Sequence, residues 1–267
     1  MRIALKLAYL GTEYYGYQIQ SGVPTIEGKL LKALRDTGAL KNLSKARYSA
    51  AGRTDRGVHA LGQVIAFDTE SAEAAKPGTL NHDLHQIWIY AWAQVGKDFN
   101  ARMSAVEREY RYVFWGKGLD IDKMKDAASI FPGTHDFRNF ADEDLEKSTL
   151  CEIKEITICN AGYWIYLDIT GNRFLQHMVR KIANALKLMG TGEKDKDWLA
   201  KMLDRSIIDM LQPMEPNGLI LMNVKYPGIK WNIDSHARSR ALDEIHELFV
   251  SRETDARMLE EIERGMR

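Results

Sequence analysis

Two strand-like stretches enclose a short loop that is dense in charge and in glycine. The loop reads Ala-Gly-Arg-Thr-Asp-Arg-Gly-Val-His-Ala over residues 51–60. Strand-like alternation precedes it over residues 46–51 and follows it over residues 60–68. Catalytic side chains are often found on loops that a rigid sheet holds at both ends. The alternative is an ordinary turn, because glycine and aspartate are frequent turn residues.

Asp55 is the residue of this loop with the clearest chemical potential. Arg53 and Arg56 flank it in the sequence, and nearby positive charge favours an ionised carboxylate. An ionised aspartate on a rigid loop can act as a nucleophile, as a base or as an anchor for substrate. A surface Asp–Arg pair without any catalytic role is the competing interpretation. The residue types alone leave both open.

The order of the predicted elements favours an α+β fold. We expect strands at 2–9, 46–51, 60–68, 87–95, 108–116 and 218–226, and a hairpin at 152–170 that turns at 160–162. Helices are expected from residue 26, at 120–130, at 174–189 and at 195–204. Hairpin-like connections between strands argue against a doubly wound sheet.

Three regions are expected along the chain. Residues 1–105 form an N-terminal half that carries the charged loop, and residues 106–230 form a C-terminal half that completes a cleft. Residues 231–267 form a helical tail with an apolar stripe, which indicates either packing on the protein's own surface or contact with a second copy.

Composition indicates a soluble globular protein, with 45% hydrophobic and 28% charged residues. No apolar run is long enough to span a bilayer, and residues 1–7 alternate like a strand rather than forming a signal peptide. We therefore expect a cytoplasmic protein without membrane contact. The two cysteines have no metal-ligand spacing with a histidine pair, and no nucleotide-binding glycine motif is present. Neither a metal nor a nucleotide cofactor is predicted.

The loop string over residues 53–60 resembles the signature Arg-Thr-Asp-x-Gly-Val-His-Ala of the tRNA pseudouridine synthase A family. Residues 108–112 resemble the Arg-x-Tyr-x-Tyr strand of that family, and residues 174–180 resemble its Phe-x-x-x-Met-Val-Arg string. The resemblance continues in order over residues 3–226. Two departures are Leu10, where the family usually has Asp, and Tyr17, where it has Trp.

This resemblance implies a pseudouridine synthase fold, in which two RRM/ferredoxin-like halves join in a mostly antiparallel sheet around a central catalytic cleft. It implies an enzyme that isomerises uridine to pseudouridine in the anticodon stem-loop of tRNA, at positions 38, 39 and 40, after flipping the base. Such an isomerisation requires no metal or cofactor. A homodimer with tRNA contacting both subunits is also implied. The open alternatives are a non-catalytic RNA-binding protein and a synthase for another RNA.

The resemblance also assigns roles to residues. Asp55 is the nucleophile, Arg180 is the partner of the aspartate, and Tyr110 stacks on the flipped uracil. Arg53 is expected to contact an RNA phosphate or to fill the gap left by the base, and His59 to belong to the substrate-binding loop, mainly as a brace. The competing interpretations are a solvated helix face for Arg180 and a sheet core for the tyrosine. We expect core packing for the two aromatic residues that follow Tyr110 on the same face, at 112 and 114.

A chain with 37 basic and 37 acidic residues must gather positive charge on one face to bind RNA. Residues 102–125 and 171–181 are comparatively basic, whereas acid is dense at 141–155 and 243–263. We expect five basic side chains near the cleft to hold the RNA backbone: Arg102, Arg108, Arg111, Arg173 and Lys181.

Overall fold

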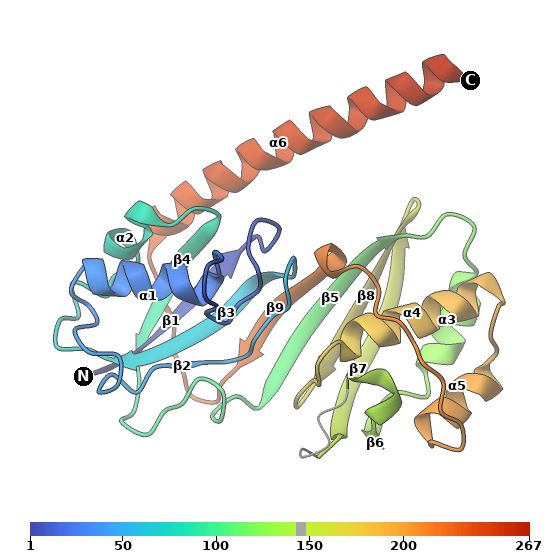
Figure 1. Cartoon of the computed structure of the whole chain (residues 1–267), viewed down its shortest axis with the longest axis horizontal. Coiled ribbons are helices and arrows are strands. Elements are labelled where there is room, and N and C mark those ends of the chain that lie inside the picture. The colour runs from blue at the N-terminus through green and yellow to red at the C-terminus, as the bar shows by residue number, and fades with distance from the viewer. Residues whose placement is uncertain (143–147) are drawn as a thin grey trace.

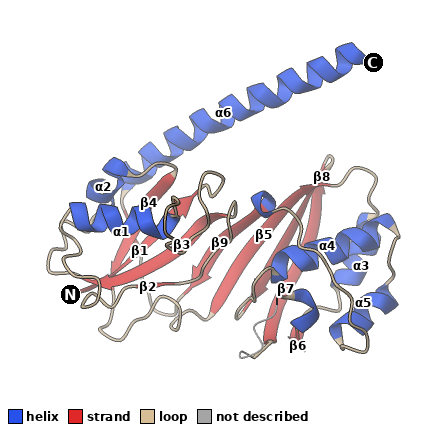
Figure 2. Ribbon diagram, viewed as in Figure 1, coloured by secondary structure: helices blue, strands red, loops and turns tan. Residues whose placement is uncertain are grey.

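The computed structural model describes residues 1–142 and 148–267, so the acidic stretch 141–155 is described only in part. Ten strands form one sheet in the order β10-β4-β1-β3-β9-β5-β8-β7-β6, with β2 added beside β3 (Figure 2). The strands are β1 (Arg2–Tyr9), β2 (Ser49–Ala50), β3 (His59–Asp68), β4 (Ile87–Gln94), β5 (Glu107–Trp115), β6 (Gly133–Asp136), β7 (Leu150–Ala161), β8 (Trp164–Gly171), β9 (Leu219–Lys225) and β10 (Asn232–Ile233).

The helices lie on the two faces of this sheet (Figure 1). They are α1 (Ile26–Asp36), α2 (Pro77–Leu80), α3 (Ile121–Ala128), α4 (Met178–Thr191), α5 (Lys196–Leu203) and α6 (Ser235–Met266). Within the described residues, every strand pair is antiparallel except the pairing of β3 with β9. The predicted α+β class with a mostly antiparallel sheet is therefore confirmed.

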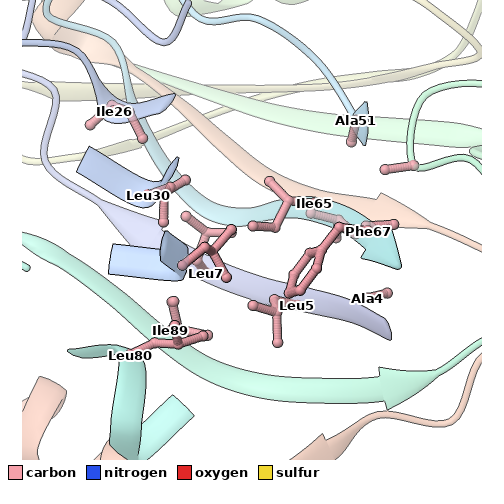
Figure 3. Close-up of a cluster of buried hydrophobic side chains, with 14 of the residues drawn as sticks. Ala4, Leu5, Leu7, Ile26, Leu30, Ala51, Ile65, Phe67, Leu80 and Ile89 are labelled. Atoms are coloured by element: carbon pink, nitrogen blue, oxygen red, sulfur yellow. The ribbon is translucent and has the colours of Figure 1, made fainter. Parts of the chain in front are cut away.

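The first hydrophobic core lies between α1 and strands β1, β3 and β4 (Figure 3). Leu5 and Leu7 alternate along β1 and turn toward the helix, where Ile26 and Leu30 supply the facing stripe. The helix begins after Thr25, whose side chain accepts a hydrogen bond from the backbone N–H of Gly28 at 3.2 Å. These contacts fix the strands that precede and follow the charged loop.

The second core lies between α3, α4 and strands β5, β7 and β8. Tyr112 and Phe114 are buried there, as expected, with exposed fractions of 2% and 7%. Tyr110 is half-buried and packs against both cores, so its side chain lies where the two halves meet. Tyr110 and Tyr112 are two residues apart on β5, so their side chains lie on the same face of the sheet. Tyr110 packs against the core that α1 covers, and Tyr112 lies in the core that α4 covers, so both helices lie on this face.

Helix α6 lies on the other face of the first half. Ala241 contacts Ala8 and Trp88, and the indole N–H of Trp88 donates to a carboxylate oxygen of Glu244 at 2.7 Å. Beyond these first turns the helix runs clear of the rest of the chain (Figure 1). The sequence predicted the helix, and the structure adds that only its beginning is packed.

Several predicted boundaries were wrong. The strand expected at 46–51 is only Ser49–Ala50, because Arg47 has a φ of 47° and its guanidinium pairs with Asp68. The helix expected at 174–189 begins at Met178, because His177 has a φ of 62° and cannot continue an α-helix. The short elements α2, β6 and β10 were not predicted, since two to four residues carry no readable periodicity.

The single parallel pairing joins the two cores. His59 and Ala60 of β3 lie opposite Ile220 and Leu221 of β9. Just beyond this pairing, a Cβ placed on Gly62 would lie 2.5 Å from the carbonyl oxygen of Met222. The backbones of the two strands therefore approach so closely that only glycine fits at position 62.

We expect Gly62→Ala to destabilise the fold by ~1–3 kcal/mol, because an added methyl group must push apart two backbones rather than a flexible side chain. Denaturant unfolding gives this difference directly. Gly96→Ala is the matched control, since nothing lies within 4 Å of a Cβ at that position. Equal unfolding free energies for the two variants would contradict the close approach.

Candidate active site

The loop that carries Asp55 is held rigidly from its inner side. Thr54 is buried, and its hydroxyl lies 2.8 Å from the hydroxyl of Tyr9. Its carbonyl oxygen accepts a hydrogen bond from the backbone N–H of Tyr17 at 3.0 Å. Burial raises the pKa of Tyr9 well above its ordinary value, so this phenol keeps its proton as a hydrogen-bond donor. The side chain next to Asp55 therefore points into the core and fixes the loop.

His59 ties this loop to both halves of the sheet. The backbone N–H of Gly11 donates to Nδ1 at 3.1 Å, so the proton of the neutral ring is on Nε2 and is donated to the carbonyl oxygen of Asn217 at 3.1 Å. A Cβ on Gly11 would lie 2.1 Å from the carbonyl oxygen of Val58, which explains why glycine occupies that position. Both ring nitrogens are thus occupied by protein contacts.

Asp55 meets Arg180 across 125 residues of sequence. Nη1 of Arg180 donates to Oδ2 of Asp55 at 3.2 Å, and Nε donates to the carbonyl oxygen of Met214 at 2.6 Å. Arg180 is 8% exposed, so the solvated helix face considered from its sequence position is excluded. Since helix α4 packs on the second core through Met178, Ile182 and Leu186, it places the guanidinium at the seam between the halves.

The imidazole of His177 also reaches this carboxylate, a contact that was not predicted from the sequence. Nε2 of His177 lies 3.3 Å from Oδ2 of Asp55, and Nδ1 lies 2.5 Å from Oδ2 of Asp142. Lys181 also contacts Asp142, with Nζ 2.8 Å from Oδ1. His177 occupies a free position of the matched string over residues 174–180, so the string itself gave no signal for it.

Tyr110 lies beside this cluster. Its ring packs edge-on against Phe174, with 5.1 Å between the centroids. Burial raises the pKa of Tyr110 to about 12; the Arg108 cation opposes this rise and the Asp55 charge adds to it. The hydroxyl therefore keeps its proton at neutral pH.

Among the described residues, Asp55 is contacted by Arg180 and His177, and not by the two arginines of its own loop. The guanidinium carbon of Arg56 lies 4.2 Å from the centre of the Tyr15 ring, which is a cation–π contact. Arg53 is exposed to solvent. The expectation that neighbours in sequence balance the charge of Asp55 was therefore wrong, because the loop directs its carboxylate toward helix α4.

Four of the five basic residues expected to hold RNA have side chains with partners within the protein. Nη2 of Arg173 donates to the carbonyl oxygen of Ser148 at 2.9 Å. Arg108 donates to the backbone carbonyl oxygens of Ala51, Arg102, Ala105 and Asn172. Arg111 forms a two-pronged pair with Asp168, at 2.7 and 2.8 Å. Lys181 binds Asp142. These contacts hold separate segments of the chain together around the proposed cleft.

Two further features concern metal binding and membrane contact. In residues 1–142 and 148–267, no group of three His, Cys, Asp or Glu side chains has the arrangement of a metal site. Among the described helices, none combines the length and the apolar character needed to cross a membrane.

We expect stability to fall in weakly acidic solution through His59. Burial lowers the pKa of this imidazole from its ordinary 6.5, so below about 6.5 the unfolded chain binds a proton that the folded chain resists. Unfolding free energies measured by denaturant titration at pH 7 and 5.5 should differ less for His59→Asn than for the natural protein. The exposed His236→Asn variant is the control and should keep the natural pH dependence. An unchanged slope in His59→Asn would contradict this origin.

Comparisons with known proteins identify the family. A family model described as tRNA pseudouridine synthase matches residues 127–227. The tRNA pseudouridine synthase A of Methanosarcina mazei is 46% identical over 265 residues, covering 98% of both chains. Those of Thermococcus sibiricus and Methanocella arvoryzae are 41% and 39% identical, covering 98% and 100% of both chains. Among solved structures, the Nop10–Cbf5 complex of the archaeal box H/ACA sRNP aligns with a TM-score of 0.36 and 11% identity, over 69% of this chain and 42% of that chain. The chain belongs to the tRNA pseudouridine synthase A family.

Proposed function

We propose that this chain isomerises uridine to pseudouridine in the anticodon stem-loop of tRNA, at positions 38, 39 and 40, with Asp55 as the nucleophile. The contact between Asp55 and Arg180 carries the proposal. It joins a carboxylate on a rigid loop to a buried cation from the other half of the chain, and both belong to strings that resemble the family's. Relatives that match over nearly their full length are named tRNA pseudouridine synthase A.

The reaction rearranges one nucleotide without net gain or loss of atoms. The bond between N1 of uracil and C1′ of ribose breaks, the base turns, and a bond forms between C5 and C1′. The proton on C5 is lost and N1 gains one, so no electron acceptor is required. Asp55 can attack C1′, attack the base or remove a proton from C2′; each route starts from its carboxylate.

The other site residues are assigned by their position. Tyr110 presents a protonated phenol ring next to Asp55, which suits stacking on a base that has left the helix. Exposed Arg53 is free to approach RNA phosphate or the gap left by the base. His59 braces the loop rather than transferring protons, because both ring nitrogens have protein partners.

The proposed cleft lies between an N-terminal half, residues 1–105, and a C-terminal half, residues 106–230. The extent of the two hydrophobic cores supports this division, and β9 contributes to both.

We place the protein in the cytoplasm with its tRNA substrate. A non-catalytic RNA-binding protein is the competing function. A protein of that kind does not need a carboxylate held by Arg180 and His177.

Release of tritium from tRNA labelled at uridine C5 tests the proposal. We expect the natural protein to release it and Asp55→Asn to lower the rate by ~10³-fold or more, because the amide cannot act as a nucleophile. Asp122→Asn, on the exposed start of α3, is the matched control and should keep full activity. Mapping of the modified positions should give 38 to 40. Absence of release from the natural protein would overturn the enzyme assignment; modification elsewhere would overturn the site in tRNA.

We also propose that the chain forms a homodimer and that tRNA contacts both subunits. The unpacked part of α6, within the tail 231–267, supports this. Leu242, Phe249 and Leu259 are 55%, 60% and 67% exposed on a helix that runs clear of its own chain. Two copies would also let a protein without net charge build a longer basic surface.

Light scattering at low and high salt should give twice the mass of one chain. Phe249→Glu should shift the protein toward the monomer, because it puts a charge into an apolar contact. The control is Glu247→Gln on the same helix, which should leave the mass unchanged. A natural protein that is monomeric at micromolar concentration would contradict the dimer.

A further inference from the structure

His177 lies between two carboxylates, one on each ring nitrogen. Nδ1 is 2.5 Å from Oδ2 of Asp142, and Nε2 is 3.3 Å from Oδ2 of Asp55. The side chain of His177 is 20% exposed, whereas those of Asp55 and Asp142 are 31% and 45% exposed. The cluster connects the proposed nucleophile to a carboxylate from the segment that follows β6.

Asp142 is itself fixed in place. Nζ of Lys181 lies 2.8 Å from its Oδ1, and its backbone N–H donates to the carbonyl oxygen of Gln176 at 3.3 Å. Burial opposes ionisation of Asp142, but hydrogen bonds and charges from Lys181 and His177 outweigh it and lower the pKa of the carboxyl. Asp142 thus remains an anionic acceptor that holds the Nδ1 proton of His177.

Each ring nitrogen of His177 thus has a carboxylate as its neighbour. The charged groups around the ring are Asp55 and Asp142, with Arg180 and Lys181 bound to the same carboxylates. The imidazole therefore links the two carboxylates at fixed distances.

Two further features show that this arrangement is specific. His177 has a φ of 62°, in the left-handed region that few residues other than glycine adopt. Backbone strain of this kind persists where the surrounding structure enforces it, often at functional sites. In the part of the chain that is described, the contacts of Arg180 and of His177 to the Asp55 carboxylate both fall on Oδ2.

We propose that His177, held by Asp142, is a positioning residue for the nucleophile. Together with Arg180 it binds Oδ2 of Asp55 and so directs the other oxygen, Oδ1, toward the substrate. The inference rests on the proposed function of Asp55. It predicts that the site loses its alignment when the imidazole is removed, because Arg180 is then the remaining described contact to Oδ2 of Asp55.

Single-turnover tritium release, measured with the protein in excess over RNA, tests this role. His177→Asn suits the left-handed backbone and can still bond Asp142, but its shorter side chain cannot reach Asp55. We expect its rate constant to fall about 10- to 100-fold, as for a misaligned catalytic group, with the Kd for RNA within about twofold of the natural value. His177→Gln, whose amide can reach Asp55 without charge, should recover part of the rate. The exposed His236→Asn is the control and should keep the natural rate.

Rescue by the conservative variant separates positioning from a merely structural role. His177→Gln should recover part of the rate that His177→Asn loses, while the Kd for RNA stays within about twofold of the natural value in both variants. If His177→Asn folds poorly, His177→Gly relieves the backbone and replaces it in the test.

The outcomes distinguish the two proposals. If the natural protein releases no tritium, the proposed function fails. If it does, and His177→Asn and His177→Gly keep the natural rate, only the role of His177 is overturned. Loss of RNA binding in parallel with loss of rate would also overturn positioning, because the defect would then lie in substrate binding.

Discussion

The parallel pairing of β3 with β9 is the contact on which the candidate site depends. It brings the end of the charged loop, at His59, against Ile220, whose neighbour in sequence, Leu219, packs in the other core. Helix α4 packs on that second core, so the seam is where the Arg180 guanidinium can reach Asp55. Gly62 permits the close approach of the two strands. A site built across a seam requires both halves to be folded.

Several charged side chains of this protein interact with groups of the protein itself. The chain has no net charge, and Arg108, Arg111 and Lys181 are engaged by carbonyl oxygens or by carboxylates. At the site this produces an alternating series of Asp142, His177 and Asp55 with cationic neighbours. Such a network costs less to bury than single charges would, because each group is paired.

Much of the architecture could be predicted, and the errors have identifiable causes. Long strands and helices were found because alternation and helical periodicity persist over eight or more residues, as in Arg2–Tyr9. The errors fall at Arg47 and His177, where a positive φ ends an element that periodicity would continue. Backbone conformation of that kind is enforced by distant contacts, so a local pattern cannot show it.

The sequence by itself determined the family, the loop that carries Asp55 and the strings that contain Tyr110 and Arg180, because these depend on residue identity and order. Only the tertiary structure decided which cations face the carboxylate. Arg53 and Arg56 are nearest along the chain, yet Arg180 and His177 are nearest in space. The reason is that side-chain direction follows from how a loop and a helix are packed on one sheet, and Coulomb interactions depend on that distance and not on separation along the chain.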